Sequence, residues 1–388
     1  MQRHAPMRQW LTCAVFLCWV PGVFADETSR LATFDADGVT SFALSVSTRL
    51  EPVVQAPHDV VILVDTSASQ SGVFQDDSRV AAEEVVRGLA LHDRCQLVAV
   101  DLDVVPLTTS WVSPRDPAIE QALRQLEDRT PLGTTDLVRG LDFAREQLQR
   151  SPHRRRVVYI GDGMSRINLL SDDEFRTLSA TLVSKRIPVS SYALGPRRDV
   201  QFLAALANHT GGNVIVDQPH RTSQEAGATL AKVIHTEIFW PERSEFSSAF
   251  LTTYPGVFPP LRADRDSIVV GTLRRDRPLT LKAVGIVGED SRTLQWSLTA
   301  EASNEDFATL PGLVELADRR GGACLPIAGS DGLRESLRVL NEQAQGLARM
   351  GRQSLRRKDF EEARRLSDAA LRIDHGNPDA SAIRDALK

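Results

Sequence analysis

Strand-like and helix-like segments alternate along residues 58–237, and no other feature constrains the fold of the chain as strongly. Strand-like, mostly apolar segments stand at 60–64, 96–100, 157–160, 189–194 and 213–216, and the first of them is a continuous apolar run rich in β-branched residues. Segments with helical spacing of apolar residues lie between or after them, at 80–89, 117–127, 136–149, 174–184, 200–208 and 224–236. Strands that are apolar throughout are buried on both faces, and crossover helices make them parallel. We therefore expect an α/β fold with a doubly wound, mostly parallel, Rossmann-like sheet.

The segments on either side have a different pattern of predicted secondary structure. Residues 41–47 alternate loosely as one strand, and short strands separated by turn signals stand at 267–273, 279–284 and 294–298. From residue 329 onward the pattern is helical. The predicted organisation is an N-terminal strand segment at 26–57, an α/β domain at 58–237, a small β module at 238–328 and a helical tail at 329–388. We also hypothesise that the strand near 41–47 pairs with strands from 267–298, which inserts the α/β domain into a β sandwich.

Residues 1–25 have the pattern of a secretory signal peptide. A positive start with Arg3 and Arg8 precedes a short apolar run, and Val23-Phe24-Ala25 supplies small residues for cleavage. The alternative is an uncleaved membrane anchor. Since no later apolar stretch approaches the length of a transmembrane helix, we expect a secreted or periplasmic protein with no stable membrane span after signal cleavage.

Composition restricts the classes of partner. The 46 Lys and Arg residues against 51 Asp and Glu residues give a net charge of −5. Nucleic-acid-binding domains carry a strong basic excess, so we expect no nucleic-acid partner. Four cysteines in 388 residues exclude a disulfide-dense scaffold. Beyond the predicted signal only Cys95 and Cys324 remain, and the sequence leaves open whether they pair.

Oxygen-bearing side chains follow the strands at the sheet edge where such folds bind ligands. One group follows the strand at 60–64, a hydroxyl precedes the helix at 136–149, and a carboxylate follows the strand at 157–160. The candidate metal ligands are Asp65, Ser67, Ser69, Thr135 and Asp162. Because three loops supply hard oxygens and no His or Cys, they suit a cation such as Mg²⁺ better than a dedicated zinc site.

This set resembles the von Willebrand factor A domain with its metal-ion-dependent adhesion site. That family carries Asp-x-Ser-x-Ser after the first strand, a Thr in a glycine-rich loop and an Asp after the fourth strand. The corresponding segments here are Asp65-Thr66-Ser67-Ala68-Ser69, Gly133-Thr134-Thr135-Asp136-Leu137 and Gly161-Asp162-Gly163. The resemblance covers residues 58–237. It implies that the three hydroxyls touch Mg²⁺, or Mn²⁺ or Ca²⁺, and that the two aspartates hold it directly or through water. One coordination position then stays open for a carboxylate of a partner.

No pattern of a nucleophile with its base, a phosphate-binding loop or a zinc-protease helix occurs in the sequence. We therefore expect no enzyme activity. The predicted function is cation-dependent binding of a protein partner that supplies an acidic residue, in adhesion or assembly. One alternative is a structural scaffold that acts through the helical tail, with the metal only stabilising the fold. Another is an enzyme that uses the cation as a Lewis acid.

Two further segments allow more than one interpretation. Residues 358–363 and 370–374 resemble the turn and second helix of one tetratricopeptide repeat. Because stacked repeats need about three copies for stability, a single one packs on its neighbour or pairs with a partner. The run Arg154-Arg155-Arg156 is either a basic docking patch or a solvated loop ahead of a buried strand.

Overall fold

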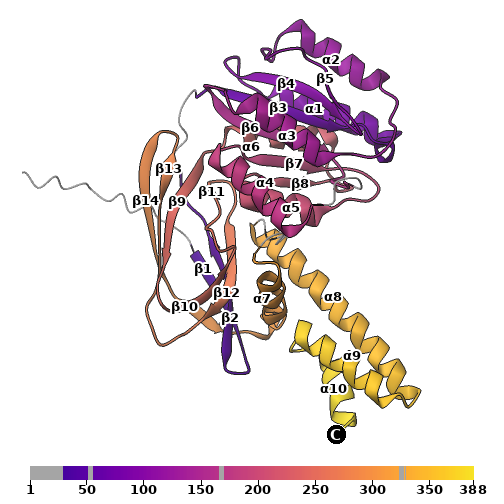
Figure 1. Cartoon of the computed structure of the whole chain (residues 1–388), viewed down its shortest axis with the longest axis vertical. Helices are drawn as coiled ribbons and strands as arrows, with labels where there is room; N and C mark the ends of the chain where they lie inside the picture. Colours follow the sequence, from indigo (N-terminus) through magenta and orange to yellow (C-terminus); the bar gives the residue numbers. More distant parts are fainter. Residues whose placement is uncertain (1–28, 51–55, 166–169, 323–326, 328) are drawn as a thin grey trace, which may run out of the picture.

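The computed structural model describes residues 29–50, 56–165, 170–322, 327 and 329–388. They form an α/β domain, a β sandwich and a helical tail (Figure 1). The predicted signal peptide at 1–25 and Cys324 lie outside the described residues. Cys95 is a buried, free cysteine.

The α/β domain contains a six-stranded sheet in the order β5-β4-β3-β6-β7-β8. All neighbouring strands are parallel except the edge strand β5, which is antiparallel to β4. The strands are β3 (His58–Asp65), β4 (Arg94–Val100), β5 (Val104–Pro106), β6 (Arg154–Gly161), β7 (Val189–Ala193) and β8 (Val214–Val216). Every residue of the central strand β3 is buried, as its continuous apolar run predicts. The doubly wound, mostly parallel fold is confirmed.

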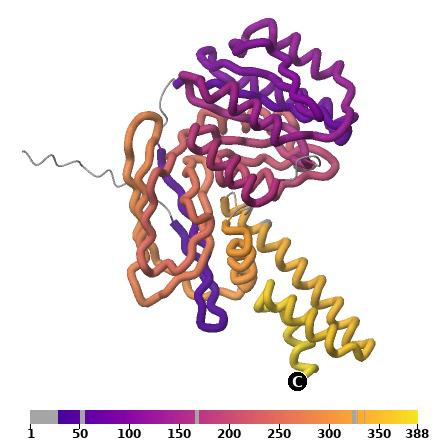
Figure 2. The backbone as a smooth tube through the Cα atoms, in the orientation of Figure 1, coloured from indigo at the N-terminus to yellow at the C-terminus, as the bar shows by residue number. Residues whose placement is uncertain are grey.

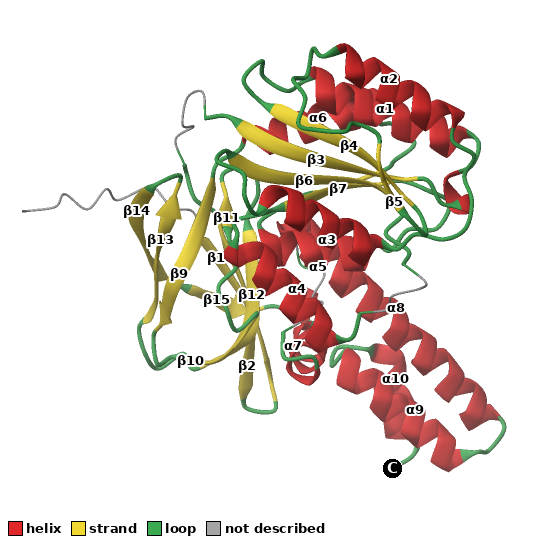
Figure 3. Ribbon diagram, turned by 45° about the horizontal axis from the view of Figure 1, so that its top comes forward, coloured by secondary structure: helices red, strands yellow, loops and turns green. Residues whose placement is uncertain are grey.

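Helices cover both faces of this sheet (Figure 3). On one face lie α1 (Val73–Arg87), α2 (Pro117–Asp128) and α6 (Ser223–His235). On the other lie α3 (Leu137–Leu148), α4 (Asp172–Ser184) and α5 (Val200–Thr210). Most of these helices begin at a side-chain cap; Ser171 and Thr222, for example, form capping boxes with Glu174 and Glu225. The short 3-10 turn η1 (Ala68–Gln70) follows β3.

The β sandwich is built from both ends of the α/β domain in sequence. Its five-stranded sheet has the order β10-β12-β2-β1-β15 and its four-stranded sheet the order β11-β9-β13-β14. The strands are β1 (Ser29–Ala36), β2 (Val39–Val46), β9 (Ile238–Phe246), β10 (Phe250–Tyr254), β11 (Leu261–Arg262), β12 (Ser267–Leu273), β13 (Leu279–Val287), β14 (Asp290–Leu298) and β15 (Ala300–Ser303). Strand β2 pairs with β12 from Val46↔Ser267 to Thr40↔Leu273, and Figure 2 shows the N-terminal strands beside those of residues 238–303. This is the pairing that an inserted α/β domain requires.

Two segments have features that the sequence does not predict. Strand β9 contains Pro241, which is tolerated because the pairing register shifts where Pro241 faces Gly285. Within the segment predicted as a β module, residues 305–307 form the 3-10 turn η2 (Glu305–Phe307) and residues 310–319 form helix α7 (Leu310–Arg319). The apolar face of α7 packs on the outer face of the five-stranded sheet, together with part of α8.

The helical tail consists of α8 (Gly329–Arg356), α9 (Phe360–Ile373) and α10 (Pro378–Ala386). Helices α8 and α9 form a hairpin whose turn contains Lys358, with φ of 62°, and Asp359, which caps α9. The helical tail was expected; its likeness to a tetratricopeptide repeat stays a prediction. Among the described helices, none has the length and apolarity that crossing a bilayer requires.

Buried arginines join the sandwich to the α/β domain. The side chain of Arg262 is fully buried and pairs with Asp264. It also donates to the carbonyl oxygens of Gly211 and Val233, each at 3.0 Å. Arg265 donates to two more carbonyls at the end of α5. Because these carbonyls lie at the C-terminal ends of α5 and α6, where a positive charge is favourable, the arginines hold the two parts together.

Candidate functional site

The structure brings the five predicted ligands together at the carboxyl end of the sheet. Asp65 ends strand β3, and its Oδ1 accepts hydrogen bonds from the Thr135 hydroxyl at 2.7 Å and the Ser67 backbone N–H at 2.9 Å. Asp65, Ser67 and Thr135 are each at most 2% exposed. Of the two threonines in the glycine-rich loop, Thr135 therefore joins the carboxylate, whereas Thr134 lines the cavity outside.

Asp162, which follows β6, completes the group. Its Oδ2 accepts a hydrogen bond from the Ser69 hydroxyl at 2.6 Å, and the hydroxyls of Ser69 and Ser67 lie 2.9 Å apart. Its Oδ1 accepts the backbone N–H of Met164 at 2.8 Å. The two serine hydroxyls thus connect the loop after β3 to the loop after β6.

A cavity of about 300 Å³ opens above this group. Its lining includes Ser67, Ser69 and Asp162, together with the exposed side chain of Arg197. Asp162 and the two serines therefore line an accessible depression, so a small cation and an incoming acidic side chain would both have a path to them.

The electrostatics of the group are unfavourable without a cation. Burial, and next the negative charge of Asp162, raise the pKa of Asp65 from 3.8 to about 6. Among the described residues, no Lys, Arg or His forms an ion pair with Asp65 or Asp162; their printed partners are hydroxyls and backbone N–H groups. Two buried carboxylates that repel each other and have no paired cation are a costly arrangement.

Sequence reasoning missed one residue of this network. The hydroxyl of Tyr159, in strand β6, donates to Asp65 Oδ2 at 2.9 Å and accepts the backbone N–H of Gly163 at 3.1 Å. Burial raises the pKa of Tyr159 well above 10, and the charge of Asp65 raises it further, so the phenol stays protonated as a donor. In the sequence this tyrosine is one member of an apolar run, and nothing there separates it from a core residue.

A close approach of two loops positions the carboxylates. A Cβ atom added to Gly161 would lie 2.4 Å from the Cβ of Asp65. Only a glycine therefore allows β6 to end so near to β3, which explains why the Gly-Asp-Gly segment can hold Asp162 opposite Asp65.

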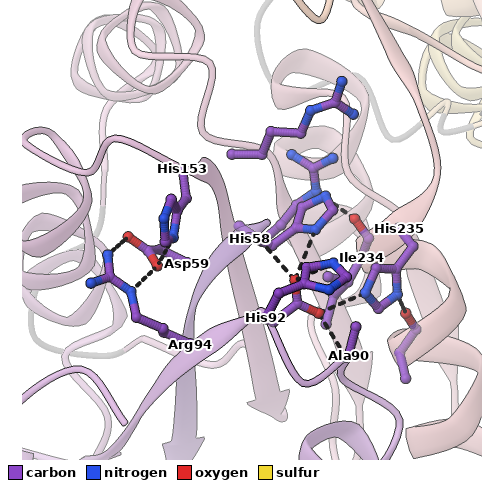
Figure 4. A network of polar contacts seen from close by, with 12 residues as sticks. His58, Asp59, Ala90, His92, Arg94, His153, Ile234 and His235 are labelled. Atoms are coloured by element: carbon purple, nitrogen blue, oxygen red, sulfur yellow. Dashed lines mark hydrogen bonds and ion pairs between the residues drawn. The ribbon is translucent and has the colours of Figure 1, made fainter. Parts of the chain in front are cut away.

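A second cluster lies at the opposite end of the sheet and includes His58, Asp93 and His235. One ligand atom from each lies within 4.8 Å of the others. Asp93 Oδ1 is 3.3 Å from His58 Nδ1, and Asp93 Oδ2 is 2.8 Å from His235 Nε2. Figure 4 shows His58 and His235 near each other, with the Asp59–Arg94 pair to their left. Sequence spacing did not find this cluster because its members are 35 and 142 residues apart.

This histidine cluster could hold a metal ion. In the structure Asp93 bridges the two histidines, and Nε2 of His58 is buried with no hydrogen-bond partner among the described residues. Asp93 also accepts the backbone N–H groups of His58 and Ala90. Burial lowers the pKa of His58 to about 4, whereas the hydrogen bond to Asp93 raises that of His235. The arrangement is therefore that of a neutral and a chargeable histidine paired with one carboxylate.

Comparison with known proteins identifies the α/β part. Residues 58–215 match the family model for the von Willebrand factor type A domain. This segment is a von Willebrand factor type A domain. All five candidate ligands lie within the matched segment. A comparison with curated proteins finds no match.

Several solved structures are similar to the chain at low identity. A von Willebrand factor type A protein from Catenulispora acidiphila is 12% identical, with a TM-score of 0.47 over 90% of this chain and 88% of that one. The ArnB paralog VWA2 from Sulfolobus acidocaldarius is 14% identical, with a TM-score of 0.42 over 94% and 98%. The PilB minor pilin from Streptococcus sanguinis is 11% identical, with a TM-score of 0.38 over 54% and 78%.

Proposed function

We propose that this protein binds a protein partner through a divalent cation, as an adhesion or assembly factor and not as an enzyme. The cation is Mg²⁺, or Mn²⁺ or Ca²⁺, held by hydroxyl and carboxylate oxygens at Asp65, Ser67, Ser69, Thr135 and Asp162. The single observation that supports it most is the pair of buried carboxylates that have no cationic partner among the described residues.

The donor set fits such an ion. Hard oxygen ligands from three loops converge, and a divalent cation would replace the repulsion between Asp65 and Asp162 by attraction to both. Hydroxyls and waters carry no charge, so as ligands they do not neutralise the cation. If the two carboxylates neutralise it only in part, the remaining positive charge attracts another anion. An acidic side chain of a partner, entering the cavity beside Arg197, would supply that anion.

The test is a calorimetric titration of Mg²⁺ and Mn²⁺ into the purified protein. We expect saturable binding in the wild type and none in Asp65→Ala. Asp103→Ala is the matched control, because Asp103 lies near the same sheet edge but is 73% exposed and paired with Arg139. If the wild type binds no cation, or if Asp65→Ala binds as the wild type does, the metal site is refuted.

The scaffold alternative draws on a different observation. A groove of about 460 Å³ lies between α7, α8 and α9, with an apolar floor that includes Leu313, Val339 and Ile373. Were this groove the partner site, Val339→Asp would abolish capture of the partner while Asp65→Ala would reduce stability alone. The cation-dependent function predicts that Asp65→Ala abolishes capture of the partner and that Val339→Asp does not. It also predicts that a chelator releases the captured partner.

We further propose that the protein acts outside the cytoplasm, as a secreted or periplasmic protein. The support is the signal pattern of residues 1–25. Fractionation of cells that express the full chain, with N-terminal sequencing of the product, tests this: an intact N-terminus in the cytoplasm would contradict it.

A further inference from the structure

A cleft of about 640 Å³ lies at the junction of the α/β domain and the β sandwich. Its walls come from the start of β6, the end of α4, the start of β9 and the turn between β13 and β14. Strand β6 begins here and ends at the candidate metal site, so the two cavities lie at opposite ends of the sheet. Small-ligand sites commonly measure about 300–1,000 Å³ and often form at domain interfaces.

The lining of this junction cleft carries excess positive charge. The cationic side chains outnumber the carboxylates by five to three: Arg154, Arg155, Arg156, Lys185 and Arg186 against Glu237, Glu289 and Asp290. One carboxylate is already used, because Glu237 pairs with Arg154. The run of three arginines opens strand β6 and is therefore not a solvated loop. Arg156 is buried and donates to the backbone oxygens of Ile234 and Arg155, so Arg155 is the arginine of the run that offers its charge to the cleft.

The guanidinium groups of Arg155 and Arg186 bond to carbonyl oxygens instead of carboxylates. Arg155 donates to the backbone oxygens of Lys185 at 2.7 Å and Ser151 at 3.1 Å, and its buried Nε has no acceptor. Arg186 donates to the backbone oxygen of Gly288 at 3.3 Å. Burial, and next the charge of Arg186, lower the pKa of Arg155. These two cations repel each other. The charge of Asp59 offsets part of this repulsion at Arg155, but no carboxylate in the described part of the chain forms an ion pair with Arg155 or Arg186.

The backbone at Arg186 is an independent indication. Arg186 follows the end of α4 with φ of 52°, a left-handed conformation that glycine or asparagine usually occupies after a helix. An arginine there is strained, yet this position brings its side chain to the cleft. Strained residues of this kind concentrate at functional sites.

We propose that the junction cleft binds a small ligand that carries phosphate or sulfate groups, held by Arg155, Lys185 and Arg186. A multiply charged oxyanion offers several acceptors to the fork of a guanidinium and a compact charge to lysine. It would also place negative charge between Arg155 and Arg186. The proposal does not depend on the metal site, which lies at the other end of the sheet.

The test measures binding of inorganic pyrophosphate and of inorganic sulfate to the purified protein by calorimetry. EDTA is present throughout so that no divalent cation contributes, and sodium chloride matches the ionic strength. We expect saturable binding of at least one ion: pyrophosphate alone would indicate a phosphate ligand, and sulfate alone a sulfated one. Binding of neither ion would overturn the proposal.

Arg186→Gly is the decisive variant. Because glycine fits the left-handed conformation, this variant removes a charge without threatening the fold, and its melting temperature checks that. We expect its dissociation constant to rise about tenfold, as loss of one charged hydrogen-bond donor implies, and Lys185→Gln to weaken binding in the same direction. Arg124→Gln is the charge-matched control, since Arg124 is 66% exposed on α2. Unchanged affinity in Arg186→Gly, or an equal loss in Arg124→Gln, would overturn the proposal.

Discussion

Replacing Asp65 with asparagine should stabilise the metal-free protein, although it removes a buried side chain of the proposed site. The reason is that the ionised form of Asp65 is disfavoured in the folded state by burial and by Asp162. The folded-state pKa lies above the unfolded value, so this penalty is absent below pH 3.8 and complete above about pH 6. The contribution of Asp65 to the stability of the metal-free wild type should therefore fall as the pH rises through that window.

The magnitude follows from the structure. Each pKa unit corresponds to about 1.4 kcal/mol. A pKa rise from 3.8 to about 6 therefore lowers the unfolding free energy by about 3 kcal/mol at pH 7.5. Asp65 is 1% exposed, so solvent screening does not reduce this value. Asparagine can keep the acceptor for Ser67 and Thr135 but not the one for the Tyr159 hydroxyl, which costs about 1 kcal/mol. The expected net gain is about 2 kcal/mol.

Urea unfolding in EDTA at pH 7.5 and pH 4 measures this gain. We expect Asp65→Asn to exceed the wild type at pH 7.5 and to lose that advantage at pH 4. Saturating Mg²⁺ should reverse the order at pH 7.5, because only the wild type gains binding energy. An Asp65→Asn variant that is less stable than the wild type in EDTA at pH 7.5 would refute the electrostatic reasoning.

Three other predictions test the site and its support. Mg²⁺ affinity should fall about tenfold for each pH unit below pH 6, since the ion competes with the proton on Asp65; titrations at pH 7, 6 and 5 measure this, and a flat profile would contradict it. Gly161→Ala should abolish Mg²⁺ binding and lower the unfolding free energy by about 1–3 kcal/mol, because its Cβ would lie 2.4 Å from that of Asp65; calorimetry and urea unfolding report the two effects separately. Arg262→Ala should lower the unfolding free energy by about 3–5 kcal/mol, because buried acceptors at the ends of α5 and α6 lose their donor; an unchanged denaturation midpoint would show that the junction is held by other contacts.

The parallel sheet and the grouping of its polar residues could be read from the sequence for one physical reason. A buried parallel strand must be apolar along its whole length, so the runs ending at Val64, Val100 and Ile160 marked strands directly. The carboxyl ends of such strands meet at one edge, so residues that follow them lie together. Neither step requires knowledge of long-range packing.

Other elements depend on their neighbours and gave no such signal. Strand β9 contains Pro241, which ordinarily argues against a strand, and only the register shift opposite Gly285 makes it acceptable. Helix α7 is ten residues long and forms because the outer face of the five-stranded sheet needs an apolar cover. The hydroxyl of Tyr159 acquires its role only when Asp65 and Gly163 come within reach.

The two ends of the sheet show why the grouping of the five candidate ligands could be predicted and the junction cleft could not. Candidate ligands at the carboxyl end directly follow their strands in the sequence, so short motifs are enough to predict that these residues lie together. At the other end, the backbone oxygen to which Arg186 donates comes from a different part of the chain, the turn at Gly288 in the sandwich. The sequence shows three consecutive arginines but not the surface that covers them. A run of charges predicts a binding site only when the element opposite it is known. In this chain that element is the turn between β13 and β14, which belongs to the sandwich into which the α/β domain is inserted.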